Sequence, residues 1–161
     1  MEIRRMEPGE ELAVSRVYAL SWKEAYRGIV PQDYLDRLSL ERWAPFLNGG
    51  GKTNFVAVEK GRIVGVSKVS PAREEAQAGW GEIISIYLLP EYFGKGIGRA
   101  LIGQDAAFLE SQGFSKIYLW VLEENRRARD FYERNGFRPN GDSIRQRIGG
   151  KELTELRYIR N

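Results

Sequence analysis

The chain has 161 residues, the size of one compact domain, and 42% of them are hydrophobic. It contains neither Cys nor His, which excludes disulfides, thiolate nucleophiles, Ser-His-Asp triads and the usual zinc sites. The net charge is +3, but residues 125–161 hold ten Lys or Arg against five Asp or Glu. This basic third favours an anionic partner such as a phosphate, although a solvated charged surface would give the same count.

The apolar periodicity predicts an alternation of helices and strands. Strands are expected over residues 3–6, 53–59, 62–69, 80–89, 116–122, 143–148 and 152–159. Helices are expected over residues 8–28, 31–38, 40–47, 98–112 and 125–135. Lys60-Gly61 and Gly149-Gly150 are typical of hairpin turns. This order predicts an α/β fold, with one mixed sheet covered by helices on both faces, and a single domain over residues 1–161.

No targeting or membrane segment is indicated. The longest apolar stretch, from Ile83 to Leu89, has seven residues and is far shorter than a membrane span. We therefore expect a cytoplasmic protein with no membrane partner. No nucleic-acid partner is expected either, because the basic third carries no nucleic-acid-binding motif.

The glycine-rich segment from Asn48 to Thr53 invites a P-loop interpretation, which the surrounding residues oppose. A P-loop ending in Gly51-Lys52-Thr53 needs glycine at position 46, where Phe46 stands. The segment also leaves a predicted helix and enters a predicted strand, the reverse of the P-loop order. We interpret it as a connector.

A second glycine-rich turn, Gly94-Lys95-Gly96-Ile97-Gly98-Arg99, follows a strand and opens a helix. Free backbone N–H groups and the positive end of the helix dipole favour an anion at such a turn. The spacing differs from a dinucleotide-binding fingerprint because Arg99 occupies the slot of the third glycine. The turn therefore predicts a phosphate site of another kind.

The predicted helix at residues 125–135 carries the second half of the signal. Asn125 and Tyr132 are two helical turns apart and share a face. Asn125 is also a natural helix N-cap. Arg126, Arg127 and Arg129 are interpreted either as phosphate contacts or as a solvated face, with Arg129 and Glu133 forming an i,i+4 pair.

Together these segments resemble the GCN5-related N-acetyltransferases, which transfer an acetyl group from acetyl-CoA to an amine. The matching pieces are Ile86–Gly98 and Asn125–Phe137, and Ser21–Pro31 also looks like the N-terminal region of many bacterial members. One departure is Phe93, which occupies the family's Arg/Gln slot; Lys95 and Arg99 could supply the missing charge.

The resemblance implies a mostly antiparallel central sheet of about seven strands and acetyl-CoA, or coenzyme A, as co-substrate without a metal. It is compatible with a homodimer. It assigns the oxyanion and the pantetheine arm to the backbone of Ile86, Tyr87 and Leu88. It assigns the remaining CoA contacts to Phe93, Gly94, Lys95, Gly96, Ile97, Gly98, Arg99, Asn125 and Arg127.

Two side chains are candidates for proton transfer. In the resembling family, the tyrosine at the position of Tyr132 protonates the departing thiolate; a core tyrosine would show the same spacing. Glu82 is the candidate base, because it lies eleven residues before Phe93, the offset at which some members of the resembling family carry a catalytic Glu. Strand alternation also places it on one face with Ile84, Ile86 and Leu88, an apolar setting that would raise its pKa. The alternatives are that Glu82 is an exposed carboxylate near the start of the strand, paired with Lys or Arg, or that a chain of water molecules deprotonates the amine, as in many members of the resembling family.

The acceptor is less defined by the sequence. Trp22, Tyr26 and Tyr34 are expected to form one wall of an acceptor groove, although such aromatics also serve as core. The acceptor is interpreted as a primary amine of a small molecule or peptide. A non-catalytic acyl-CoA-binding sensor of the same fold is the alternative.

Overall fold

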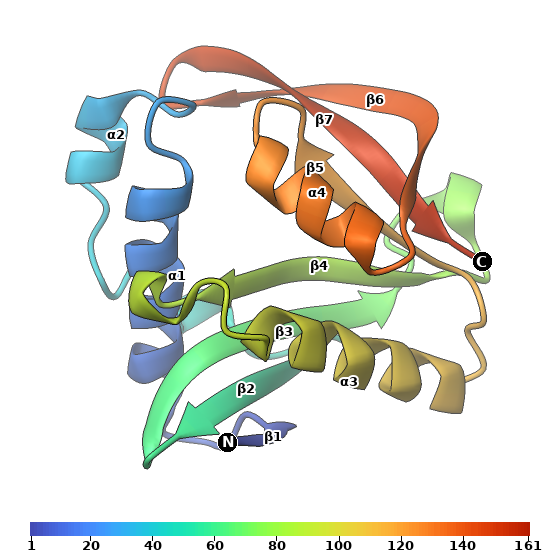
Figure 1. Ribbon diagram of the computed structural model, residues 1–161, viewed down its shortest axis with the longest axis horizontal. Helices are drawn as coiled ribbons and strands as arrows, with labels where there is room; N and C mark the ends of the chain where they lie inside the picture. The colour runs from blue at the N-terminus through green and yellow to red at the C-terminus, as the bar shows by residue number, and fades with distance from the viewer.

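A computed structural model describes all residues from 1 to 161 and contains one seven-stranded sheet, in the order β1-β2-β3-β4-β5-β7-β6 (Figure 1). The strands are β1 (Glu2–Arg5), β2 (Thr53–Glu59), β3 (Arg62–Pro71), β4 (Gly81–Leu88), β5 (Ile117–Leu122), β6 (Arg138–Ile148) and β7 (Lys151–Arg160). All neighbouring pairs are antiparallel except β4 and β5. The predicted mixed, mostly antiparallel sheet is confirmed.

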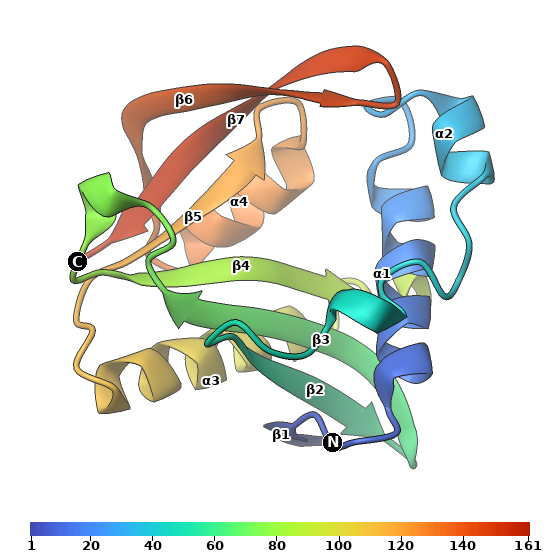
Figure 2. The same ribbon diagram turned by 180° about the vertical axis from the view of Figure 1, so that it is seen from behind.

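Helices cover both faces of the sheet, as expected. They are α1 (Glu11–Ala25), α2 (Gln32–Asp36), α3 (Ile97–Ser111) and α4 (Arg126–Arg134), with short 3₁₀ turns η1 (Ala44–Phe46), η2 (Glu75–Gln77) and η3 (Pro90–Tyr92). Figures 1 and 2 show α3 and α4 on one side of the sheet and α1 on the other. No helix of the chain has the length and hydropathy needed to cross a membrane.

Two expectations about the elements were wrong. The helix expected over residues 40–47 is only the single turn η1, because Pro45 removes a helical donor and the backbone N–H of Trp43 donates instead to the Ser15 hydroxyl of α1 at 3.0 Å. Strand β6 begins at Arg138 rather than near residue 143, because its first two residues already pair with the end of β7.

The parallel strands β4 and β5 separate soon after they begin. They pair only at Gly81 with Ile117 and at Glu82 with Tyr118. Beyond this point β4 stays on β3, while β5 continues on β7. The β5-facing edge of β4 therefore carries unpaired backbone groups, which a ligand could satisfy.

A β-bulge at Ile84 reverses the alternation of side chains along β4. Lys68 pairs with Ser85 but the next residue of β3, Val69, pairs with Ile83, which leaves Ile84 without a partner. A bulge shifts every residue on its far side to the opposite face of the sheet. Even-numbered residues before the bulge and even-numbered residues after it therefore lie on opposite faces of the sheet.

The contacts of β4 identify its faces. A Cβ placed on Gly81 would lie 3.0 Å from Leu109 of α3, so Gly81 faces α3 and its neighbour Glu82 faces away. After the bulge, Ile86 lies opposite Ser67, whose hydroxyl donates to Asp105 of α3. Glu82 is consequently on the α1 side, on the face opposite to Ile86.

Candidate active site

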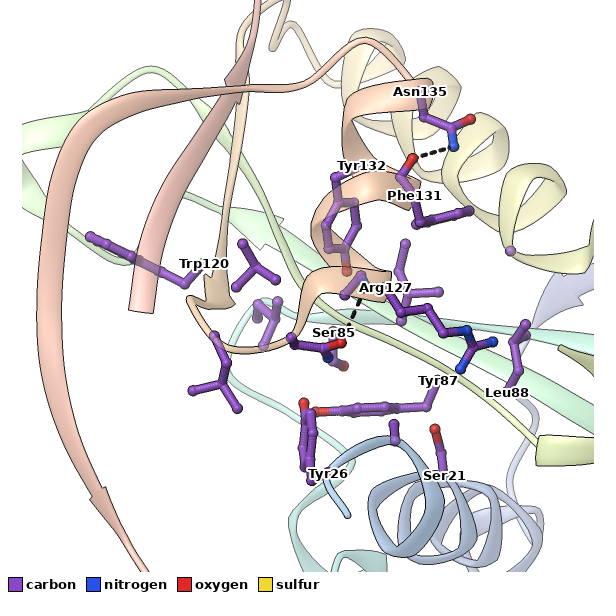
Figure 3. Close-up of a pocket in the computed structure, with 18 of the residues that line it drawn as sticks. Ser21, Tyr26, Ser85, Tyr87, Leu88, Trp120, Arg127, Phe131, Tyr132 and Asn135 are labelled. Carbon is purple, nitrogen blue, oxygen red and sulfur yellow. Dashed lines mark hydrogen bonds between the residues drawn. The ribbon is translucent and has the colours of Figure 1, made fainter. Parts of the chain in front are cut away.

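A pocket of about 940 Å³ opens where β4 and β5 separate. Eleven of the fourteen residues assigned from the sequence to proton transfer or CoA binding line it: Ile86, Tyr87, Leu88, Phe93, Gly94, Gly96, Gly98, Arg99, Asn125, Arg127 and Tyr132. Three others, Lys95, Ile97 and Glu82, do not. The residues predicted on α3, α4 and β4 thus line the same pocket (Figure 3).

The N-terminus of α3 forms the anion-binding end of this pocket. Gly94 and Gly96 have φ values of +74° and +85°, which favour glycine, and a Cβ at either would meet nothing within 4 Å. The backbone N–H groups of Ile97, Gly98 and Arg99 donate to no backbone carbonyl. Open space and free donors are what a phosphate requires at a helix N-terminus.

Ile97 contributes to this end only through its backbone. Its side chain is buried in the core, where it lies beside Gly65 of β3. Lys95 is exposed, and its ammonium lies 5.4 Å from the centre of the Tyr92 ring. Lys95 therefore stands at the rim of the turn rather than in the pocket wall.

Phe93 is covered by the guanidinium of Arg127, which lies 3.6 Å from the ring centre. Arg127 comes from the first turn of α4 and makes no ion pair and no hydrogen bond to another side chain. The stacking brings a cation from α4 to the position of the aromatic residue on the α3 turn. A positive charge is thus present although residue 93 is uncharged.

Asn125 caps α4, as expected: its Oδ1 accepts a hydrogen bond from the backbone N–H of Ala128 at 3.2 Å. The predicted pair between Arg129 and Glu133 is wrong in detail. Arg129 Nε donates to the hydroxyl of Tyr158 at 3.0 Å, and this hydroxyl donates to Glu133 at 2.8 Å. The Tyr158 hydroxyl lies between the two charges and replaces their direct contact.

Tyr132 projects from α4 toward β4, with its hydroxyl in the gap between the strands (Figure 3). Burial, with smaller contributions from Tyr87 and Asp105, raises its pKa above the ordinary value of 10. The phenol is therefore fully protonated near neutral pH. Its spacing from Asn125 corresponds to a pocket position rather than to an enclosed core position.

Glu82 lies outside this pocket. It is 1% exposed and accepts hydrogen bonds from Arg73 Nη2 at 2.6 Å and from the Tyr118 hydroxyl at 2.7 Å. Burial favours a higher pKa, but these hydrogen bonds and the Arg73 charge together hold it below its usual range. The expected raised pKa was wrong, because Arg73 and Tyr118 stabilise the charged carboxylate and the bulge at Ile84 turns Glu82 away from the apolar face of Ile86. Of the alternative, the pairing with Arg is confirmed, but the side chain is buried rather than exposed.

The α1 side of the pocket is aromatic. Tyr26, the residue that follows α1, and Tyr87 of β4 bring their hydroxyl ends together on this wall (Figure 3). Trp22 and Tyr34, which the sequence also placed in the acceptor wall, do not line the pocket and instead pack in the smaller core cluster around Leu35. Of the three expected aromatics, only Tyr26 faces the cavity.

Several lining residues could not be identified from the sequence. They come from the segment after β3 and from β5, β6 and β7, and are Arg73, Glu74, Trp120, Gln146 and Glu155. No element was predicted over the segment that holds Arg73 and Glu74. The strands that carry Trp120, Gln146 and Glu155 were predicted, but which side chains of a half-buried strand face a cavity depends on strand register. The pocket thus has a donor half, lined by α3 and α4, and an acceptor half, lined by α1, the segment that follows β3 and the β6–β7 hairpin.

Comparison with known proteins gives a consistent result. The family model described as Acetyltransferase (GNAT) family matches residues 14–137. The Uncharacterized N-acetyltransferase YuaI of Bacillus subtilis is 38% identical over 114 residues, which cover 70% of this chain and 66% of that relative. The Spermidine N(1)-acetyltransferase of Thermoplasma acidophilum is 25% identical over 142 residues, covering 86% of this chain and 88% of the relative.

Solved structures share the fold. The PaiA N-acetyltransferase of Thermoplasma acidophilum, crystallised in complex with coenzyme A, matches with a TM-score of 0.74 at 22% identity, covering 99% of this chain and 98% of the other. The Ribosomal-protein-alanine N-acetyltransferase of Brucella melitensis matches with a TM-score of 0.77 at 20% identity, covering 99% of both chains.

Proposed function

Because this chain belongs to the GNAT family of acetyltransferases, we propose that it transfers the acetyl group of acetyl-CoA directly to a primary amine of a small molecule or peptide. The observation that carries the proposal is the convergence of three features on one pocket. These are the anion-binding turn of α3, the unpaired edge of β4 and the Tyr132 phenol.

The donor half fits acetyl-CoA. Its phosphates would lie on the free N–H groups at the start of α3, with Arg127 supplying charge and Arg99 and Lys95 at the rim. The stacking of Arg127 on Phe93 supports binding despite the absence of a cation at position 93. The Asn125 side chain, whose oxygen caps α4, still has an amide N–H₂ for the pantetheine arm.

The groups needed for acetyl transfer lie at the gap between β4 and β5. Backbone groups of Ile86, Tyr87 and Leu88 lie on the unpaired edge of β4, where they can bind the pantetheine arm and stabilise an oxyanion. Tyr132 holds a proton near neutral pH and would donate it to the departing thiolate. Without Cys or His, the chain offers no ordinary nucleophile for an acyl-enzyme, so direct attack by the amine is the simplest route.

The names of similar proteins suggest which amines to test as acceptors. One is named a spermidine N(1)-acetyltransferase and another a ribosomal-protein-alanine N-acetyltransferase. We would therefore measure acetyl-CoA binding by calorimetry and then thiol release with spermidine, a peptide that begins with alanine, and simple primary amines. Binding followed by amine-dependent thiol release supports the proposal. Binding without release from any amine favours an acyl-CoA sensor, and no binding refutes both.

Tyr132→Phe is expected to lower turnover about 100-fold, because the thiolate then leaves without a positioned proton donor. Acetyl-CoA affinity, measured by calorimetry, is expected to stay within about twofold, since the ring and its packing remain. Tyr92→Phe is the matched control, because it removes a phenol hydroxyl that does not line the pocket. Unchanged turnover of the Tyr132 variant would remove Tyr132 as the acid.

A further inference from the structure

The acceptor half of the pocket contains two carboxylates in different electrostatic settings. Glu74 accepts hydrogen bonds from the side chains of Arg157 and Trp120, and its charge is balanced by the arginine. Glu155 of β7 makes no ion pair, and its only side-chain hydrogen bond comes from Gln146 Nε2 at 3.3 Å. Glu155 is therefore the pocket carboxylate that is free to receive a cation.

Strand register directs Glu155 to the α1 side of the sheet. It lies directly opposite Leu122 of β5, which packs with Leu153 and with the residues around α2 in the smaller core cluster. The next residues along β7 alternate, and Tyr158 reaches α4 on the other face through Arg129. Glu155 consequently faces the acceptor half, across the gap from the donor half.

The titratable groups around Glu155 come from the end of α1, from β4 and from the segment after β3. The hydroxyls of Tyr26, at the C-terminal end of α1, and Tyr87 on β4 face it; burial raises the pKa of both, and the charge of Glu155 adds to this rise. From the segment after β3, Arg73 acts on it from a distance while its guanidinium is bound to Glu82.

On the hairpin itself, the flanking groups are neutral or already paired. Gln146 of β6 is uncharged, and Arg157, two residues further along β7, is held by Glu74 and Asp142. Burial is the main cause that raises the pKa of Glu155 above its ordinary 4.5, and Arg73 opposes it only in part.

We propose that Glu155 is a catalytic residue that binds the ammonium group of the acceptor and takes its proton. The inference rests on the proposed acetyltransferase function and names the acceptor-side base of that pocket. A carboxylate without a cationic partner, flanked by the aromatic side chains of Tyr26 and Tyr87, suits an alkylammonium ion. Glu82, the base expected from the sequence, lies outside the pocket and already has its cation.

The protons balance in this scheme. Glu155 takes one proton from the alkylammonium group, which leaves a neutral amine and a carboxylic acid. The nitrogen lone pair forms the C–N bond to the thioester carbonyl carbon, whose oxygen becomes the oxyanion, and the C–S bond breaks as the carbonyl re-forms. Tyr132 gives its proton to the departing sulfur and regains one from the nitrogen, and Glu155 releases its proton to water. The sum is an N-acetyl amine, a thiol and one proton, with no change of oxidation state.

The test compares Glu155→Gln with the wild-type protein over pH, using the amine on which the wild type is active. At neutral pH kcat/KM is expected to fall about 100-fold, in the range that a general base contributes. The variant's remaining rate should rise with pH toward the ordinary pKa of an alkylamine, about 10, because only amine deprotonated in solution then reacts. The difference from wild type is therefore expected to shrink at alkaline pH.

Glu152→Gln is the matched control, since Glu152 lies on the same strand, is exposed and pairs with Arg145 outside the pocket. Calorimetry should give all three proteins the same acetyl-CoA affinity, which shows that the donor half is intact. A Glu155→Gln loss below about threefold, an equal loss at every pH, or a loss confined to KM would overturn the proposal. A wild-type protein inactive on every amine would overturn the proposed function as well.

Discussion

At the scale of single residues, helical spacing was informative and strand alternation was not. The seven-residue interval from Asn125 to Tyr132 predicted a shared face, and both side chains line the pocket. Strand alternation failed for Glu82, because the bulge at Ile84 leaves no signal in the sequence and places Glu82 on the face of the sheet opposite to Ile86. Glu155 had no distinguishing pattern either, since its position depends on the register between β7 and β5.

The buried position of Glu82 predicts a structural role. Glu82→Gln is expected to lower the free energy of unfolding by about 1–3 kcal/mol, because Arg73 and Tyr118 lose a charged acceptor. Folding holds the pKa of Glu82 below that of the unfolded chain, so this stabilisation is present above about pH 4.5 and is lost on acidification. Urea unfolding of wild type and Glu82→Gln at pH 7 measures the difference in the free energy of unfolding.

Glu152→Gln again serves as control, with an expected change below about 0.5 kcal/mol, because its ion pair is exposed. The pH dependence of kcat/KM in Glu82→Gln should match that of the wild type. A displaced pH profile with normal stability would restore Glu82 as the base.

Asp105 makes stability depend on pH in the opposite sense. It is fully buried on α3, one oxygen accepts from the Ser67 hydroxyl at 2.6 Å and the other has no partner. Burial raises its pKa from 3.8 to about 7. The folded state therefore keeps a proton that the unfolded state loses, so the contribution is complete below about pH 4 and is lost as the pH rises to about 7.

Asp105→Asn, which cannot ionise, should remove that dependence. Three pKa units correspond to about 4 kcal/mol, so wild type should lose up to this amount relative to the variant between pH 4 and 7. Urea unfolding at several pH values measures it. Glu110→Gln, an exposed change on the same helix, should follow the wild-type curve. Parallel curves for wild type and Asp105→Asn would show that Asp105 is ionised throughout.

At the scale of elements, most boundaries could be predicted because turns and periodicity agreed. The expected strand at 53–59 matches β2, and the glycines after α3 and α4 mark the ends of these helices within two residues. The helix expected at 40–47 failed because the apolar spacing of Leu40, Trp43 and Leu47 ignores the proline between them. Nor could the separation of β4 from β5, which creates the pocket, be read from the sequence of either strand.

The packing of α3 on α4 depends on a glycine. A Cβ on Gly98 would lie 3.1 Å from two ring carbons of Phe131, the residue before Tyr132. Gly98→Ala is therefore expected to displace α4 and to weaken acetyl-CoA binding about tenfold by calorimetry, since Arg127 and Asn125 move with that helix.

Gly103→Ala on the same helix is the control, because a Cβ there meets nothing within 4 Å. It should leave affinity unchanged and raise stability by about 0.5–1 kcal/mol through helix propensity. If both variants bind acetyl-CoA with the affinity of the wild type, the contact between α3 and α4 does not determine how the donor half binds acetyl-CoA.

At the scale of the whole molecule, the hairpin pairs β2–β3 and β6–β7 follow from the chain order, whereas the closure of the acceptor half does not. The tip of the β6–β7 hairpin reaches α2, a contact between segments about 115 residues apart that both views show (Figures 1 and 2). Lys151 Nζ donates to the backbone carbonyl of Ile29 at 2.9 Å and pairs with Glu124 at 3.6 Å. The hairpin that carries Glu155 is thus fixed at its far end.

Gly149 and Gly150 form that tip and allow the contact to be tested with matched variants. Both have positive φ, +60° and +85°, so alanine strains the backbone at either position. Only at Gly149 would a Cβ also clash, 2.8 Å from Cβ of Tyr34. Gly149→Ala should therefore push the tip away from α2, raising KM for the amine severalfold while acetyl-CoA affinity stays constant, because β7 carries the acceptor half and α3 with α4 the donor half. Gly150→Ala should lose similar stability without the KM change; equal KM values in both variants would show that the tip contact does not shape the acceptor half.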